Sequence, residues 1–474
     1  MSFSILGLSS RGSEGSAFWR GEESHSANEE VFDWTGKLKD ESLKTQDKAT
    51  LLIHGGHLID PAARIDAPMD ILLKDGRVAE VAAPRKIKGA DRKFDARGLV
   101  VAPGFIDLHV HLREPGQQHK ETIATGTAAA AAGGFTSVCT MPNTAPVVDS
   151  AEWVKWLQQP DRGAVVNVFP IAAATRASKG AVLTEFSALQ SAGAIAVTDD
   201  GKPILDDQVM REALMLGGEL NFPVVQHAED TRMTEHCSMH AGARSFRLGL
   251  RGMTSAAEAS IIERDVQLAL QIPNARLHVA HVSSADALKP LRRGKRAKSR
   301  ITFEVTPHHF TLTDEDMRDY DSNYKMNPPL RSPADREAIL VALADGTVDA
   351  IATDHAPHAA HEKEMEFERA AFGITGLETA LALAITQLHV AKRIPLKRIV
   401  ELFTAGPVRC FDLRGRGSLA RGSFADMTIF DPKKKWTFSA AKSLSKSRNT
   451  PFDGWQLTGK VVATIVGGNI VYNA

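Results

Sequence analysis

Six residues of metal-binding types lie along the middle of the chain, each at or just after the end of a short apolar run. Two of them form a His-x-His pair in the segment GFIDLHVHLREPG. Side chains two apart on a strand point to the same face, so both imidazoles can bind one ion. A lone strand histidine is more often a core residue than a ligand, so the combination is what predicts a metal site. The complete set is His109, His111, Asp200, His227, His281 and Asp354.

The ligand types also predict the metal and its chemistry. Imidazole and carboxylate without cysteine favour Zn²⁺, with Mn²⁺ or Co²⁺ as alternatives. Four histidines and two aspartates exceed the needs of one four-coordinate ion that keeps an open position, so of one or two ions we expect two. A pair of ions lowers the pKa of bound water and polarises a carbonyl, which favours hydrolysis of an amide-like bond.

The elements that position these residues follow from the apolar pattern. Eight short apolar runs alternate with helix-like stretches over about 300 residues, as an α/β fold of the (β/α)8 TIM barrel type requires. Active-site residues of such barrels lie at the C-terminal ends of the strands, where the six candidates fall. The interval from His227 to His281 exceeds one unit of roughly 31 residues. We therefore expect an insertion around Cys237 to Met253, where no clean apolar run lies.

Both ends of the chain have a different hydrophobic pattern from the middle. Short β-branched or leucine-rich runs broken by glycine, aspartate and proline occur from Leu51 to Ala82 and again from Phe424 to Asn473. They predict strands and turns, and hence a small β-sandwich domain built from both chain ends. Residues 1–48 are polar, and we expect a flexible N-terminal extension there. The predicted boundaries are 1–48 for the extension, 49–101 and 407–474 for the two parts of the β-sandwich domain, and 102–406 for the barrel.

Composition excludes several classes of partner. Lysine plus arginine (57) equals aspartate plus glutamate (57), so no net charge attracts nucleic acid or an anionic membrane. No apolar run reaches the length of about 20 residues that a membrane span needs. The three cysteines, Cys139, Cys237 and Cys410, form no metal-type pair, and their odd number argues against a disulfide framework. We expect a cytoplasmic protein that acts on a small molecule.

Nine segments carry a family resemblance that begins at about Leu51 and covers nearly all of the chain from there. They are PGFIDLHVHLREPG, TMPNTAPVVD, VTDDGKP, HVAHVSS, EVTPHHF, MNPPLRS, ATDHAPH, GITGLETAL and SRNTPFDGW. Together they resemble the amidohydrolase superfamily and, within it, the type I dihydroorotases. The resemblance implies that the six residues above are the metal ligands and that Asp200 bridges the ions. Asp199 is the competing candidate, and a carboxylated Lys202 is the alternative that allantoinases and dihydropyrimidinases suggest.

The same resemblance implies a substrate pocket around the metal site. Its members are Arg113, Asn143, Asn327, His358 and the backbone groups near Phe372 and Gly373. Arg113 follows His111 by two residues, and its guanidinium fork suits a ring carboxylate. The alternatives are a surface ion pair of Arg113 with Glu114, a turn role for Asn143 and a plain loop position for His358. For His278 we expect a structural role, because it lies three residues from His281 and on a strand faces away from it. For His308 and His309 we expect structural roles or roles behind the ligands.

The activity implied is that of a dihydroorotase in pyrimidine biosynthesis: reversible cyclisation of N-carbamoyl-L-aspartate to L-dihydroorotate and water. Asp354 would be the catalytic base and acid. One alternative is another cyclic-amide hydrolase, such as an allantoinase or dihydropyrimidinase. A second is a non-catalytic partner of aspartate carbamoyltransferase, although such subunits tend to lose metal ligands and this chain retains all six. We also expect a homo-oligomer, and association with aspartate carbamoyltransferase is compatible with activity.

Overall fold

The eight apolar runs of the middle form one parallel sheet in a computed structural model, which describes residues 49–297, 299–391 and 393–474. Its neighbours follow chain order, and a parallel bridge between Val110 and His355 closes the sheet into a barrel. The His111 N–H supports this closure by donating to the His355 carbonyl at 2.9 Å. The predicted TIM barrel is confirmed. Its strands are β6 (Phe105–Val110), β7 (Phe135–Thr140), β8 (Asn167–Ala172), β9 (Ala196–Thr198), β10 (Val224–Gln226), β13 (Arg276–Val279), β14 (Arg300–Val305) and β15 (Ala350–Ile351).

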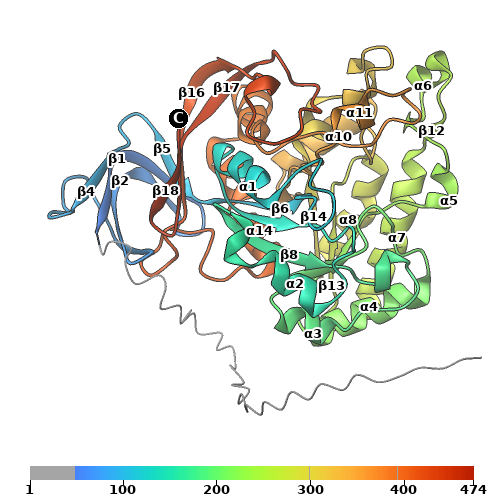
Figure 1. The fold of residues 1–474 in the computed structure, drawn as a ribbon, viewed down its shortest axis with the longest axis horizontal. Helices are drawn as coiled ribbons and strands as arrows, with labels where there is room; N and C mark the ends of the chain where they lie inside the picture. Colours follow the sequence, from blue (N-terminus) through green and yellow to red (C-terminus); the bar gives the residue numbers. More distant parts are fainter. Residues whose placement is uncertain (1–48, 298, 392) are drawn as a thin grey trace, which may run out of the picture. The chain divides into compact units, whose positions relative to one another are not determined.

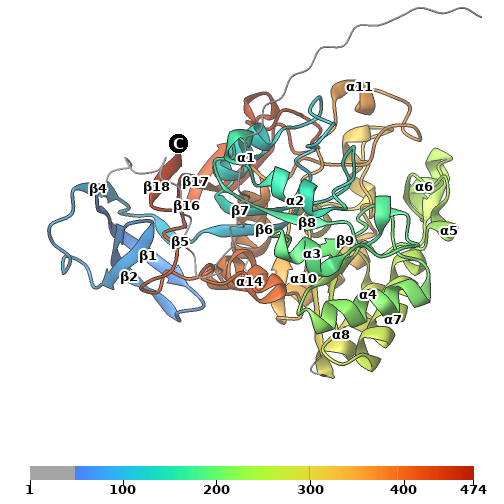
Figure 2. The same cartoon turned by 60° about the horizontal axis from the view of Figure 1, so that its bottom comes forward.

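Helices cover the outside of the barrel, as Figure 2 shows for α2 and α3 beside β8 and β9. Local sequence fixes where several of them begin. The Thr122 side chain caps α1 and the Ser332 side chain caps α10, each by accepting the backbone N–H three residues further on. The helices that follow the barrel strands are α1 (Ile123–Ala132), α2 (Ala151–Leu157), α3 (Phe186–Ser191), α4 (Asp207–Glu219), α7 (Ser255–Gln271), α8 (Ala285–Arg296), α10 (Pro333–Ala344), α12 (Ala380–Ala384), α13 (Leu396–Phe403) and α14 (Ala405–Phe411).

The long interval between β10 and α7 contains the predicted insertion. It consists of α5 (Thr231–Thr234), β11 (Met239–His240), α6 (Ala243–Leu248) and β12 (Gly252–Met253). β11 and β12 pair in parallel as a separate two-stranded sheet. They are not part of the barrel, which agrees with the expectation that no barrel strand lies there.

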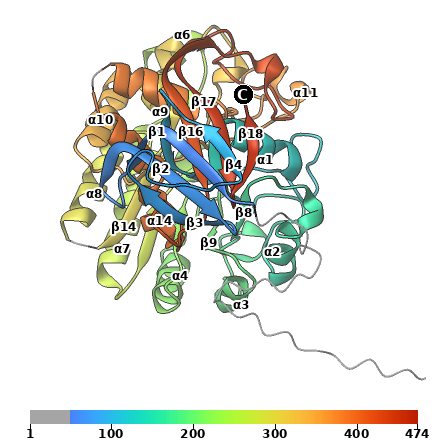
Figure 3. The same cartoon turned by 90° about the vertical axis from the view of Figure 1, so that its left-hand side faces the viewer.

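The chain ends build a second eight-stranded sheet, seen face-on in Figure 3. Its order is β18-β17-β16-β5-β1-β2-β3, with β4 beside β1. β5 joins the two ends, because it pairs in parallel with β1 and antiparallel with β16. The strands are β1 (Leu51–Asp60), β2 (Ile65–Lys74), β3 (Arg77–Ala82), β4 (Arg92–Asp95), β5 (Val100–Pro103), β16 (Met427–Thr437), β17 (Gln456–Val466) and β18 (Asn469–Asn473).

Blue strands and red strands therefore lie side by side in Figure 1, as expected for a β domain made from both ends. Aromatic packing joins this sheet to the barrel: the Phe105 ring of β6 stacks on Phe403 at 5.2 Å and lies 6.0 Å from Phe430 of β16. The predicted extension, residues 1–48, lies outside the described residues, and the predicted domain boundaries stay predictions.

Candidate metal centre and substrate pocket

The six predicted ligands meet at one end of the barrel, because each lies at the C-terminal end of a strand. His109 belongs to β6 and His111 follows it, while the other four follow β9, β10, β13 and β15. All six side chains are buried, each with 5% or less of its surface exposed. Of the remaining strands, β7 is followed by Asn143 and β14 by α9 (Pro307–Thr311), while α11 (Ala360–Lys363) comes after β15.

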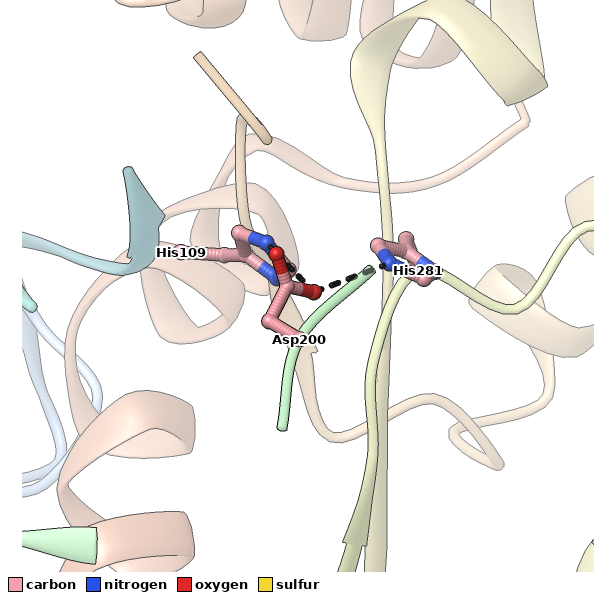
Figure 4. A group of neighbouring side chains, drawn as sticks. All are labelled: His109, Asp200 and His281. Carbon is pink, nitrogen blue, oxygen red and sulfur yellow. Dashed lines mark ion pairs between the residues drawn. The ribbon is translucent and has the colours of Figure 1, made fainter. Parts of the chain in front are cut away.

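Asp200 lies at the centre of this group (Figure 4). Its Oδ1 atom is 3.5 Å from His109 Nε2, 3.8 Å from His281 Nε2 and 3.7 Å from His227 Nδ1. Its Oδ2 atom is 3.7 Å from His111 Nε2. One carboxylate thus faces all four histidines, which is the position that a bridging ligand needs.

Asp354 forms a second group with the His-x-His pair. Its Oδ1 atom is 3.1 Å from His111 Nε2 and 3.5 Å from His109 Nε2. Two triads of ligand atoms therefore lie side by side and share His109, one with Asp200 and His281 and the other with His111 and Asp354. This arrangement can hold two neighbouring ions.

The charges of the cluster fit a divalent cation. Burial alone would raise the pKa of Asp200, but the surrounding histidines, His109 first, hold it well below its usual value. Burial likewise would lower the pKa of His109, but Asp200 and Asp354 raise it well above the ordinary value. The Nε2 atom of His109 is buried without a hydrogen-bond partner among the described residues. Buried carboxylates and a lone imidazole nitrogen directed at one another form a donor set that suits a divalent cation.

Three residues behind the ligands fix their orientation. Glu304 of β14 accepts from His109 Nδ1 at 3.1 Å and from His278 Nε2 at 3.2 Å. Glu229 lies 3.0 Å from His227 Nε2, and Asn143 Oδ1 lies 2.9 Å from His111 Nδ1. Such contacts set which ring nitrogen is free to bind a metal.

Sequence reasoning missed Glu304 and Glu229. Burial would raise the pKa of each carboxyl group, but hydrogen bonds from their histidine partners lower it to about 2. Glu304 did carry a signal, since a charged residue inside the apolar run ITFEV needs a buried partner. His278, for which a structural role was expected, contacts Glu304 and through it lies behind His109.

The choice between two adjacent aspartates has a geometric basis. Asp199 turns away from the cluster and accepts from the Thr175 backbone N–H and hydroxyl group. Lys202 is exposed. Of the three candidates for the bridge, only Asp200 faces the histidines.

A cavity of about 230 Å³ opens above the ligands. All twelve predicted site residues line it except His109, which lies beneath, and Gly373. Sequence reasoning missed three of the lining residues, Gly201, Met326 and Ala356. The predicted residues that line the cavity are His111, Arg113, Asn143, Asp200, His227, His281, Asn327, Asp354, His358 and Phe372.

Arg113 is a buried cation at this cavity. It is 8% exposed, and its Nε atom donates to the Pro357 carbonyl at 3.1 Å. Its Nη2 atom is 3.2 Å from His358 Nε2. Burial lowers the pKa of Arg113 to about 10, so the guanidinium keeps its charge, whereas burial and the Arg113 charge lower the pKa of His358 to about 3. Within the described part of the chain Arg113 has no ion-pair partner, so the alternative interpretation, a surface ion pair with Glu114, does not apply.

Two predicted substrate contacts are already engaged. Asn143 donates from Nδ2 to Asp200 Oδ2 at 3.0 Å in addition to its contact with His111. Asn327 donates to Glu229 Oε2 at 2.8 Å. Both amides line the cavity, but both also hold the side chains of the metal cluster in place.

Three residues of the site have strained backbone conformations. Arg113, His281 and Asp354 have φ values of 60°, 33° and 46°, in the left-handed region that favours glycine. Such conformations cost about 1–3 kcal/mol each and persist where the surrounding structure enforces them.

None of the helices in the described ranges is both long and apolar enough to cross a membrane.

Comparisons with known proteins agree with this geometry. A family model described as Dihydro-orotase-like matches residues 98–287. The chain is 49% identical to the dihydroorotase of Solibacter usitatus and 47% identical to that of Anaeromyxobacter dehalogenans, in each case over 89% of this chain and 98% of the relative. An L-hydantoinase (dihydropyrimidinase) from Arthrobacter aurescens shares the fold, with a TM-score of 0.80 at 24% identity over 90% of this chain and 96% of that one. The chain belongs to the dihydroorotase family.

Proposed function

We propose that this protein is a metal-dependent dihydroorotase that interconverts N-carbamoyl-L-aspartate and L-dihydroorotate in pyrimidine biosynthesis. The observation that carries the proposal is the buried Arg113 cation, without an acidic partner in the described chain, at the edge of a cavity floored by histidines and aspartates. Dihydroorotate has a carboxylate that can pair with Arg113 and a cyclic amide that can lie over the histidines and aspartates of the cavity floor. The identity of 46–49% to dihydroorotases along nearly the whole of their length supports this choice over other cyclic-amide hydrolases.

We further propose zinc as the metal, with two ions. His109, His111 and Asp354 would hold one ion, His227 and His281 the other, and Asp200 would reach both. When bound, the metal supplies an activated water and polarises the carbonyl of the scissile amide. The donor set of imidazoles and carboxylates without thiols supports zinc.

The chain's own groups then divide the remaining work. Arg113 binds the ring carboxylate through its free guanidinium N–H groups and thereby orients the ring. Asn327, His358 and Phe372 line the rest of the cavity and exclude water from the ring, and the Gly373 backbone lies directly next to Phe372. In hydrolysis, a C–O bond forms as the amide C–N bond breaks. Asp354 Oδ1 takes the proton from the attacking water and gives it to the leaving nitrogen, so one carboxylate serves as base and acid.

The reaction's direction depends on pH. Ring closure removes a carboxylate charge from N-carbamoyl-aspartate and consumes a proton overall. Lower pH therefore favours synthesis of the ring, and higher pH favours its hydrolysis. An equilibrium that does not change with pH would contradict the proposed reaction.

Turnover of L-dihydroorotate by purified, zinc-supplemented protein tests the proposal. Allantoin and dihydrouracil serve as parallel substrates, and chelator treatment followed by zinc restoration is the control. We expect turnover of dihydroorotate alone, lost with the chelator. Turnover of either parallel substrate in preference to dihydroorotate would favour a different cyclic amidohydrolase.

The Asp354→Asn variant separates an enzyme from a non-catalytic subunit. The enzyme should lose turnover by several orders of magnitude, whereas a subunit that only binds aspartate carbamoyltransferase would retain that binding. Association with aspartate carbamoyltransferase, a homo-oligomeric state and a cytoplasmic location remain predictions from the sequence. Size-exclusion chromatography with and without aspartate carbamoyltransferase tests the first two.

A further inference from the structure

The Gly373 backbone, which lies next to the substrate cavity, is held by two side chains, one ten residues earlier in the chain and one 76 residues later. Its carbonyl accepts from Lys363 Nζ at 3.1 Å and from Asn449 Nδ2 at 3.0 Å. Its N–H donates to the Lys325 carbonyl at 2.9 Å. Every hydrogen-bonding group of this peptide is therefore engaged.

Space around Gly373 is as restricted as its hydrogen bonding. A Cβ atom on this residue would lie 2.5 Å from the Ala356 carbonyl oxygen and 2.8 Å from His358 Cδ2. Both contacts are far below normal van der Waals distance. The backbone here thus packs directly against His358, the residue that touches Arg113.

Asn449 fixes both sides of this contact. Its Oδ1 atom accepts the His358 backbone N–H at 3.0 Å, and its Nδ2 atom donates to the Ala356 carbonyl at 3.0 Å as well as to Gly373. The side chain is 4% exposed. One amide thus holds the segment that carries His358 and the segment that carries Phe372 and Gly373 at a fixed distance from each other.

The amino groups of Lys363 and Lys325 are buried and donate to backbone carbonyl groups. Lys363 is 5% exposed and also donates to the Ala371 carbonyl at 2.8 Å. Lys325 donates to the Phe367 and Glu368 carbonyls, and its ammonium lies 4.3 Å from the centroid of the Phe372 ring. In the described structure neither lysine has an acidic ion-pair partner. Burying an ammonium group is costly, and here it orders the loop that ends at the cavity.

We propose that Lys363 and Asn449 are positioning residues that jointly fix the Gly373 peptide and, through it, the cavity wall that faces the substrate ring. The inference rests on the proposed dihydroorotase activity for its kinetic consequence, but the ordering of the peptide does not depend on that activity. Neither side chain lines the cavity, so each acts only through the backbone that it holds.

Two single variants and their combination test the proposal. Asn449→Asp keeps the acceptor for the His358 N–H and removes the donor to Gly373, while Lys363→Met removes the ammonium with little change in length. Because both side chains bind the same Gly373 carbonyl, the effects of the two substitutions on KM should not multiply. We expect each to raise KM for dihydroorotate about tenfold, or about 1.4 kcal/mol, with a much smaller change in kcat, and the double variant to raise KM by clearly less than the product.

Asn167→Asp is the matched control. Asn167 donates from its amide to the Thr136 carbonyl at 2.7 Å, at the start of β8 and hence at the other end of the barrel. Asn167→Asp should lower the melting temperature without raising KM. Lys363→Gln, which keeps a donor of shorter reach, should lie between Lys363→Met and the native protein, and it remains informative if Lys363→Met fails to fold.

Hydrogen–deuterium exchange gives a readout that needs no turnover. The backbone amides of residues 371–374 should exchange faster in Asn449→Asp and Lys363→Met than in the native protein. In Asn167→Asp their exchange rates should equal the native rates. Native exchange rates in this segment, or folded variants with native KM, would overturn the inference. Native protein that does not turn over dihydroorotate would overturn the proposed function instead, and exchange would still decide whether the two residues position Gly373.

Discussion

Replacing Glu304 with glutamine should weaken metal binding although this side chain touches neither the cavity nor the proposed ions. Glu304 is 1% exposed and accepts hydrogen bonds from both His109 and His278. To bind a metal through Nε2, His109 must carry its proton on Nδ1 and donate it to Glu304 Oε1. A carboxylate can accept from both histidines at once, which keeps His109 in this tautomer.

Glutamine has only one oxygen, so it can accept from one histidine and must present its NH₂ group to the other. If that group faces His109 Nδ1, the favoured tautomer has its proton on Nε2 and cannot bind the metal. Loss of such a partner behind a ligand typically costs 10- to 100-fold in metal affinity. That corresponds to about 1.4–2.7 kcal/mol of binding free energy.

Zinc competition against a chromophoric chelator measures the change directly, without turnover. Asp60→Asn is the control, because Asp60 is also a fully buried carboxylate but lies in the sheet of the chain ends, where it accepts from the Leu419 N–H at 2.7 Å. It should lose stability and keep its zinc affinity. Native zinc affinity in a folded Glu304→Gln protein would refute the argument that Glu304 sets the His109 tautomer.

Three further predictions concern substrate binding, pH and the core. Arg113→Lys should raise KM for dihydroorotate roughly 10- to 100-fold in steady-state assays, since an ammonium cannot reproduce the guanidinium fork; an unchanged KM would exclude Arg113 as the carboxylate partner. Burial and the nearby Lys325 ammonium lower the pKa of Lys363 from its ordinary value of 10.5 to about 7. The unfolded chain thus binds more protons than the folded one from about pH 7 to 10. The free energy of unfolding, measured by urea denaturation, should therefore rise with pH in this range, and it should rise less in Lys363→Met. Equal slopes would contradict this assignment. Phe105→Ala should cost about 3–5 kcal/mol of unfolding free energy, because it empties the contact with Phe403 and Phe430; a loss below about 1 kcal/mol would mean that the barrel and the end sheet are not joined there.

The barrel could be predicted from the sequence because its strands are buried on both faces. Such strands appear as continuous apolar runs, for example the fully buried FTSVCT of β7. The ligands were visible for the same reason, since His109 or Asp354 stands out at the end of an apolar run. Pairing of β5 with both β1 and β16 could not be derived, because strand order depends on contacts between distant segments.

Residues that act behind the site were harder to find. Glu304 and Glu229 became recognisable only when the structure showed which histidine each one touches. Asn449 lies in the segment SRNTPFDGW, which carried the family resemblance but no chemistry of its own. Its three hydrogen bonds reach residues 76 to 93 positions earlier in the chain. No local pattern encodes such contacts.

The position of Asn449 also sets the order in which the site is made during synthesis. All six proposed ligands and all barrel strands have left the peptidyl-transferase centre once Asp354 is added. The amide that ties His358 to Gly373 comes roughly 100 residues later, which is about 5–20 s at ordinary rates of translation. A nascent chain thus carries its complete set of ligands before it carries a finished substrate wall. Metal capture by the growing chain can precede substrate binding by that interval.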